Sequence, residues 1–500
     1  MVGANGICGG NDCRSTFPET LGPKSEAAIF LMEIRQVGDR LNALRGESEC
    51  RELYNLKNPL DVDAPAAIRS RFVKALTVTS APSQYIAASE RDNITPGQIF
   101  NLDQYVFWPV EPTNTPRMPE SLNTLLPKKV LTGLDIQFPG INEPHTMDVS
   151  KYLKNRLPSG VVDTIKKNGA EFFLVNSTPG ELAAYYKARG FDRCTIFNSP
   201  SSTKFYVLSN QLTGEKKVVV SGINSQARLE HQLIQFYFSG VDVENAVTAI
   251  GKFDDVKSSS LQQLKAQLNN VKADCKILYI GSRWWVMEAI GNNENGLKGA
   301  NEGEGYKMLK PETHKIGSLV YDLAYLDNNK TAVAAIRMPN GELAGDVMKA
   351  FIEAGFHKVV MCGAGGRISG DAEIGEYILV KCSNYKGEDV RLREKATILD
   401  VSGSMYVNMN SKSNVTVNSP LVETKVWLKE QKDGDTGSVD VETAHIFKAV
   451  NESDREITIM PGMFVSDVVG ERPLEKKIAG NGAEKHIQDF TVSTLKQLRV

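Results

Sequence analysis

Three short segments in the second half of the chain carry side chains suited to acid–base chemistry on a polar substrate. A glycine cluster ends the run Met361–Gly366, an acidic pair lies at Asp440 and Glu442 before a helical pattern, and an apolar run ends in Ser466 and Asp467. A carboxylate accepts hydrogen bonds from hydroxyl groups, and a protonated carboxyl group can deliver a proton to a leaving group. Together these residue types are suited to acid–base chemistry and to hydrogen bonding with polar groups of a ligand.

Each segment also has an ordinary structural interpretation. A glycine cluster after a strand is most often a tight turn. Glu442 before a helix is favoured by the helix dipole alone, and a Ser-Asp pair after a strand often caps the next helix. The hypothesis of a site therefore depends on all three segments and their order along the chain.

The elements around these segments predict an α/β fold with a mixed central sheet flanked by helices and an additional N-terminal α+β region. Strand patterns at 276–282 and 358–366 enclose a helical pattern at 341–355 that ends at a glycine. Ligands of such sheets bind where the strands end. We expect a flexible arm at 1–25, a helix and a proline-rich irregular region at 26–150, an α/β region at 151–270, and a catalytic domain at 271–500. A degenerate copy of the catalytic domain is one interpretation of 151–270.

The composition of the chain argues against several functional classes of protein. The 500 residues carry 58 Lys and Arg against 60 Asp and Glu, a net charge of −2, which argues against a globally basic nucleic-acid binder. No apolar run is long enough to span a membrane, and the N-terminus does not resemble a secretory signal. Seven cysteines are too few for a disulfide framework, so we expect reduced thiols and a cytoplasmic protein. No metal-ligand spacing or dinucleotide fingerprint predicts a cofactor.

The second half resembles the nucleoside phosphorylase and nucleosidase superfamily, also called purine nucleoside phosphorylase-like. Its landmarks occur in the same order over 271–500. The family's strand that ends in Pro-Gly-Asp followed by Arg corresponds here to Ile280–Arg283, and its glycine loop corresponds to Cys362–Gly366. Its Gly-Asp pair corresponds to Gly375-Glu376. Its Glu-Met-Glu-Ala-Ala motif corresponds to Asp440–Ala444, and its late Ser-Asp pair to Ser466-Asp467. The resemblance implies cleavage of the N-glycosidic bond of a purine nucleoside or nucleotide, a small-molecule substrate, and a homo-oligomer.

The same resemblance implies roles for individual residues. Asp467 would protonate the purine base as the bond to the sugar breaks, with Ser466 beside it as a substrate-binding residue. Glu442 would hold the 2′ and 3′ hydroxyls of the ribose, and its charge would stabilise the developing sugar cation. Val441 would pack near the base or the sugar.

An anion or attacking group would lie against the backbone of Gly363, Ala364 and Gly365, with Arg283 and Arg337 as contacts for a phosphate. Phosphorolytic members have an Arg and a Thr or Ser at the glycine loop that this chain lacks. Hydrolysis is therefore the first hypothesis and phosphorolysis the alternative. A non-catalytic nucleotide-binding or interaction protein that retains the fold is a further alternative.

Within the superfamily, the chain resembles the AMP nucleosidases, whose plan is a large N-terminal region followed by a nucleosidase domain. That plan suits a chain of 500 residues and makes AMP a candidate substrate.

Overall fold

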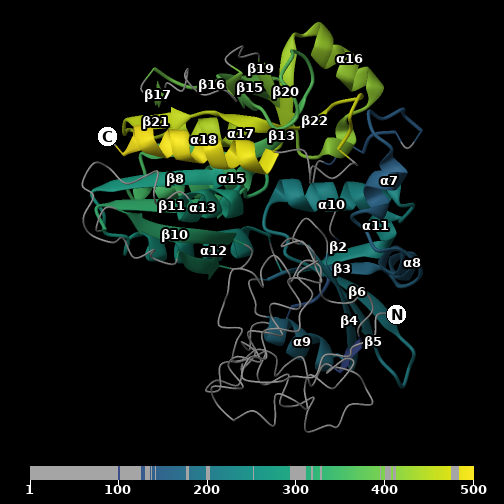
Figure 1. Ribbon diagram of the computed structural model, residues 1–500. Coiled ribbons are helices and arrows are strands. Elements are labelled where there is room, and N and C mark those ends of the chain that lie inside the picture. The colour runs from purple at the N-terminus through teal and green to yellow at the C-terminus, as the bar shows by residue number, and fades with distance from the viewer. Residues whose placement is uncertain are drawn as a thin grey trace, which may run out of the picture. The chain divides into compact units, whose positions relative to one another are not determined.

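Figure 1 shows the fold of the chain in a computed structural model. The chain divides into two units, Met1–Thr95 and Pro96–Val500, and all described residues lie in the second unit. The arm expected at 1–25 and the helix expected at the start of 26–150 lie outside the described residues. The structure describes residues 99–101, 125–129, 136, 138–140, 142–175, 179–198, 203–251, 253–292, 311–316, 319–326, 329–394, 396–399, 407–408, 413–474 and 483–499.

The first sheet is built by the earlier part of this unit. Its strands are β1 (Ile99–Asn101), β2 (Lys128–Lys129), β3 (Ala170–Leu174), β4 (Arg193–Asn198), β5 (Lys204–Ser209), β6 (Lys216–Ser221) and β7 (Val247–Gly251). They lie in the order β1-β4-β5-β6-β3-β7-β2, with β3 parallel to both β6 and β7. All five residues of β3 are buried, as expected for an apolar run inside a parallel sheet.

Six helices accompany this part of the chain. They are α7 (Val149–Lys154), α8 (Ser159–Asn168), α9 (Pro179–Lys187), α10 (Gln226–Phe238), α11 (Val243–Ala246) and α12 (Phe253–Leu268). Ser225 is the N-terminal cap of α10, and its hydroxyl oxygen accepts a hydrogen bond from the Arg228 backbone N–H at 3.0 Å. Its apolar residues Leu229, Leu233 and Phe236 follow helical spacing and pack into the core beside the first sheet.

The second sheet consists of β8 (Cys275–Gly281), β9 (Glu312–Ile316), β10 (Leu319–Leu326), β11 (Thr331–Arg337), β12 (Lys358–Met361), β17 (Ala396–Ile398) and β21 (Ile457–Met460). Its order is β17-β21-β12-β8-β11-β10-β9. The strands β11, β8, β12, β21 and β17 are parallel, so their carboxyl ends meet at one edge of the sheet.

Helices cover both faces of this sheet. They are α13 (Arg283–Asn292), α15 (Glu342–Glu353), α17 (Thr443–Asn451) and α18 (Ala483–Leu498), together with α12. Leu278 and Ile280 of β8 face the core that contains α12, α15 and α17. Ile277 and Tyr279 face the other core, where α13 packs against α18, the helix drawn in yellow in Figure 1. The alternation along β8 explains why its sequence is a nearly continuous apolar run.

The third sheet continues two strands of the second. It contains β13 (Gly363–Arg367), β14 (Tyr377–Leu379), β15 (Cys382–Tyr385), β16 (Glu388–Arg391), β18 (Val407–Asn408), β19 (Ser413–Thr416), β20 (Thr436–Asp440) and β22 (Gly462–Val468), in the order β16-β15-β19-β20-β13-β22-β14-β18. The chain passes from β12 into β13 through Cys362 and from β21 into β22 through Pro461. A short 3-10 helix η1 (Pro420–Val422) and α16 (Lys425–Asp433) precede β20.

The predicted fold class, a mixed α/β fold with sheets flanked by helices and an additional N-terminal α+β region, is confirmed. The boundaries between the predicted domains stay predictions. Within the described residues no helix is both long and apolar enough to cross a membrane. The described cysteines Cys194, Cys275, Cys362 and Cys382 are free thiols.

One ordinary local interpretation was wrong. The glycine cluster, which as an ordinary feature would be a tight turn, is the strand β13, which pairs with β20 on one side and β22 on the other. The strand expected to finish in Ser466 and Asp467 is β22, which ends one residue later at Val468. Glycine makes the pairing possible because a Cβ atom at Gly365 would lie 2.7 Å from the Val439 carbonyl oxygen.

Candidate active site

The register of three adjacent strands brings the predicted segments together. Gly366 of β13 pairs with Val439 of β20 and with Asp467 of β22. Neighbouring strands lie about 4.8 Å apart, which places Val439 and Asp467 about 10 Å apart across Gly366. Segments separated by many residues in the sequence thus meet in the middle of the third sheet.

An irregularity in β22 positions Asp467. Gly365 pairs with Val465 and Gly366 with Asp467, so Ser466 is an extra residue without a partner in the register. The Ser466 hydroxyl lies 3.0 Å from the Gly365 carbonyl oxygen and 2.6 Å from Asp467 Oδ1, and both oxygens accept from it. Bulges of this kind redirect side chains and are frequent beside active sites. Ser466 therefore orients the Asp467 carboxyl group.

The Asp467 carboxyl group is 6% exposed and lies on the side of β13 to which Gly366 and Ala364 face, where Val439 and Val469 also cover Gly366. A Cβ atom at Gly366 would lie 3.3 Å from Asp467 Oδ2. Ala364, two residues earlier in the same strand, faces the same side and is exposed, although β13 is an interior strand. Gly363 and Gly365 face the other side and are buried. The sequence predicts an anion or attacking group against Gly363, Ala364 and Gly365, and of these three residues Ala364 is the exposed one.

Glu442 lies beyond the end of β20, at the N-terminal cap of α17, and is 8% exposed. Burial raises the pKa of its carboxyl group well above the usual value, and the neighbouring Asp440 charge raises it further. Hydrogen bonds from the backbone of Val441 and Gly341 and the positive charge of Arg228 act in the opposite direction. Glu442 is therefore a buried carboxyl group whose ionisation depends on its partners.

Asp440, the other member of the acidic pair, has a structural role. Its Oδ2 accepts a hydrogen bond from the Thr443 backbone N–H at 3.0 Å at the start of α17. Its Oδ1 accepts from Asn414 at 2.9 Å and from Thr416 at 3.0 Å, which ties β20 to β19. These bonds hold Asp440 in place as a cap and a cross-strand link.

Glu423, in a segment to which the sequence assigned no chemistry, is the charged neighbour of Asp467. It follows η1 and is buried. Burial raises the pKa of Glu423 well above its usual value, and the charge of Asp467 adds to the rise, while a hydrogen bond with Thr146 opposes it. Two neighbouring carboxyl groups in a buried place are not both readily ionised. This pair is thus able to retain a proton.

Arg283 and Arg337 lie at the carboxyl edge of the second sheet. Arg283 begins α13, and its Nη1 is 2.9 Å from Oδ1 of the fully buried Asp322. The Thr313 hydroxyl donates to the same oxygen at 2.7 Å. Arg337 ends β11 opposite Gly281 of β8. The predicted phosphate contact Arg283 therefore serves an internal ion pair, and a role in phosphate binding stays a prediction for both arginines.

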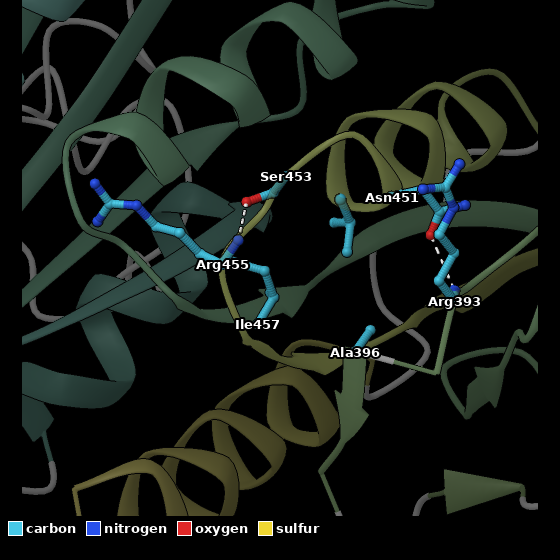
Figure 2. A pocket seen from close by; sticks show the side chains of 7 residues that line it. Arg393, Ala396, Asn451, Ser453, Arg455 and Ile457 are labelled. Carbon is cyan, nitrogen blue, oxygen red and sulfur yellow. Dashed lines mark hydrogen bonds between the residues drawn. The ribbon is translucent and has the colours of Figure 1, made fainter.

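Two cavities formed by described residues lie away from these side chains. The larger, about 370 Å³, is lined by Thr146, Lys425, Leu428, Lys429, Lys432, Asp433 and Gly470. Figure 2 shows the smaller, about 10 Å³, where the Asn451 side chain accepts a hydrogen bond from the Arg393 backbone N–H at 3.0 Å. Neither Glu442 nor Asp467 lines either of the two.

The sequence offered few signals for the two charged residues that were missed. Glu423 lies in a polar loop with no motif. Arg228 lies near the start of α10, and a charged residue near the start of a half-apolar helix is ordinarily taken for a solvated one. Its burial becomes visible only when α10 is placed against the second half of the chain.

Comparison with known proteins gives a limited result. The sequence matches no family model and no curated protein. Among solved structures, similar chains include a putative methylthioadenosine nucleosidase from Weissella paramesenteroides, with 12% identity and a TM-score of 0.33 over 45% of this chain and 97% of that one. A futalosine hydrolase mutant of Helicobacter pylori has the same identity and TM-score, over 45% of this chain and 98% of that one.

A third similar structure is the S-adenosylhomocysteine nucleosidase from Streptococcus pyogenes in complex with 5-methylthiotubericidin. It has 14% identity and a TM-score of 0.31, over 46% of this chain and 100% of that one. The similar solved structures are thus nucleosidases and a futalosine hydrolase that align with less than half of this chain. At these scores the likeness by itself supports no conclusion about the activity of this protein.

Proposed function

We propose that this chain hydrolyses the N-glycosidic bond of a purine nucleoside or nucleotide, with AMP as the candidate substrate. The observation that carries the proposal is the position of the Asp467 carboxyl group over Gly366, on the sheet face where Ala364 is open to solvent. The order of the motifs along the sequence supports it as well. A ligand placed over Ala364 would have the oriented carboxyl group of Asp467 beside it.

In this proposal Asp467 is the catalytic acid. Bond cleavage leaves negative charge on the purine, and a proton or a strong hydrogen bond at the base makes it a better leaving group. Ser466 orients the carboxyl group, and the buried Glu423, whose raised pKa favours its neutral form, is a neighbour of the acid. Glu442 holds the ribose hydroxyls, and its negative charge stabilises the oxocarbenium-like sugar. Val441 and Ala364 contact the bound nucleoside.

Water is the proposed nucleophile. The Arg283 guanidinium is engaged by the buried Asp322, so of the two predicted phosphate contacts it is less suited to bind inorganic phosphate. The experiment is incubation with AMP or adenosine, with and without phosphate, followed by chromatography of base and sugar products. Free base and ribose or ribose 5-phosphate without added phosphate support hydrolysis. Ribose 1-phosphate that appears only with phosphate supports phosphorolysis.

A non-catalytic nucleotide-binding protein is the second candidate. The observation that favours it is burial, because Glu442 is 8% exposed and Asp467 is 6% exposed. Calorimetric binding of AMP with no release of base over long incubation would support this candidate. The homo-oligomer and the cytoplasmic location expected from the resemblance stay predictions, and sedimentation velocity tests the first.

A further inference from the structure

The first turn of α10 is fixed against a turn of the second half. Glu342, at the start of α15, accepts hydrogen bonds from the backbone N–H groups of Gln226 at 2.5 Å and Ala227 at 3.3 Å. A carboxylate at a helix N-terminus satisfies free N–H groups and complements the helix dipole. Gly341 has φ +58° and would clash with the Ala227 side chain if it carried a Cβ atom. The two elements are therefore in close contact.

This contact places Arg228 beside Glu442. Arg228 is 8% exposed, and its Nη2 donates a hydrogen bond to Asn340 Oδ1. The next residue of the same turn, Gly341, hydrogen-bonds to Glu442 through its backbone. Glu442 and Arg228 thus contact the same two-residue turn, and their opposite charges attract each other.

We propose that Arg228, which comes from the first half of the chain, is a positioning residue that holds Glu442 as an oriented carboxylate. The inference rests on the proposed function, because it assigns Arg228 a part in binding the ribose through Glu442. It means that the first half of the chain completes the site. Asn340 is the link that fixes the guanidinium group.

The charges around Glu442 give the physical reason. Asp440 faces Glu442 from β20 and disfavours its ionised form, while Arg228 faces it from α10 and favours that form. Tyr152 of α7 faces Arg228 in turn. Burial lowers the pKa of Arg228 to about 10, so the guanidinium group stays charged at neutral pH. Removing this charge would raise the pKa of Glu442 further and favour its neutral form, which cannot stabilise a sugar cation.

The kinetic test compares R228M, which removes the charge, with R228K, which keeps it. The control is R189M, because Arg189 is an exposed arginine of the first half that stacks on Tyr185, with its guanidinium carbon 3.4 Å from the ring centre, and follows α9 rather than lying in α10. We expect R228M to lower kcat/KM for AMP by about 10–100-fold, as for loss of a charge-assisted contact. R228K should retain most of the activity, and R189M should match the wild type.

The pH profile separates positioning from general loss of structure. Glu442 must be ionised to act, so activity rises with pH through its pKa. Loss of Arg228 raises that pKa, so the acidic limb of kcat/KM moves to higher pH in R228M and stays in place in R228K. An unmoved limb in R228M, or equal losses in R228M and R228K, would overturn the proposal.

A thermal-unfolding cycle tests the pair without any activity. If Arg228 and Glu442 are partners, the loss of Tm in R228M/E442Q is smaller than the sum of the losses in R228M and E442Q. Additive losses with intact turnover overturn the pair and keep the proposed reaction. Coupled losses with no turnover by the wild type keep the pair and overturn the proposed reaction.

Discussion

Replacing Arg283 by methionine tests whether this arginine serves the interior or a ligand. Its Nη1 lies 2.9 Å from Asp322 Oδ1, and the two side chains are 10% and 0% exposed. Methionine removes the guanidinium group and leaves a buried carboxyl group without its cation. Removing one partner of a buried pair costs about 3–5 kcal/mol. At about 2–4 °C per kcal/mol for a domain of 150–250 residues, Tm should fall by roughly 6–20 °C.

The matched control is K265M. Lys265 lies 2.8 Å from Glu353, but these side chains are 46% and 59% exposed. Water screens such a pair, which contributes about 0–1 kcal/mol. Differential scanning calorimetry of both variants at one pH measures the contrast. If R283M loses no more stability than K265M, the Arg283–Asp322 ion pair does not stabilise the interior of the fold. Arg283 would then remain a candidate for binding phosphate.

The pH dependence of this loss has a defined sign. Burial raises the pKa of Asp322 above 3.8, and the charge of Arg283 opposes the rise. In R283M that opposition is lost, so the folded chain holds a proton on Asp322 more tightly than the unfolded chain does. The stability contributed by a group with a raised pKa falls as pH increases from the unfolded to the folded pKa. The difference between wild type and R283M should therefore widen from about pH 4 to pH 7.

Three further predictions concern the third sheet and its neighbours. The variant G365A, whose Cβ atom meets the Met463 sulfur, should lose about 1–3 kcal/mol by urea unfolding, whereas G160A, with open space around it, should lose nothing. The variant D467N should lower turnover of AMP about 10²–10⁴-fold with an unchanged far-UV circular dichroism spectrum, and full activity would remove Asp467 as the acid. Burial lowers the pKa of His231 to about 3, so the unfolded chain gains a proton first and stability falls as pH drops below about 6.5. The variant H231N should lose less stability than the wild type between pH 7 and pH 5, and equal losses in urea midpoint would contradict this.

Elements with strong local patterns were predictable. The strand expected at 276–282 is β8 at Cys275–Gly281, and the helix expected at 341–355 is α15 at Glu342–Glu353. Both have an apolar period and clear ends, so neighbours in the sequence are enough to specify them. The helix α10 has the same kind of local signal, with a serine cap at Ser225 and apolar residues at helical spacing.

The glycine cluster shows where this reasoning fails. Local preferences of glycine favour a turn, but Gly363–Arg367 is a strand because β20 and β22 lie on both sides of it. The same pairing creates the bulge at Ser466 and turns Asp467 toward Gly366. The orientation of Asp467 thus depends on strands about 100 and 30 residues away.

The sequence by itself determined the α/β fold class, most strands and helices, and the residue types suited to acid catalysis and hydroxyl binding, because these follow from periodicity and side-chain chemistry. Only the tertiary structure decided which charges meet. It paired Arg283 with Asp322, placed Glu423 near Asp467, and set Arg228 beside Glu442. The physical reason is that ionisation and attraction depend on burial and distance, and both are set by contacts between segments far apart in the chain.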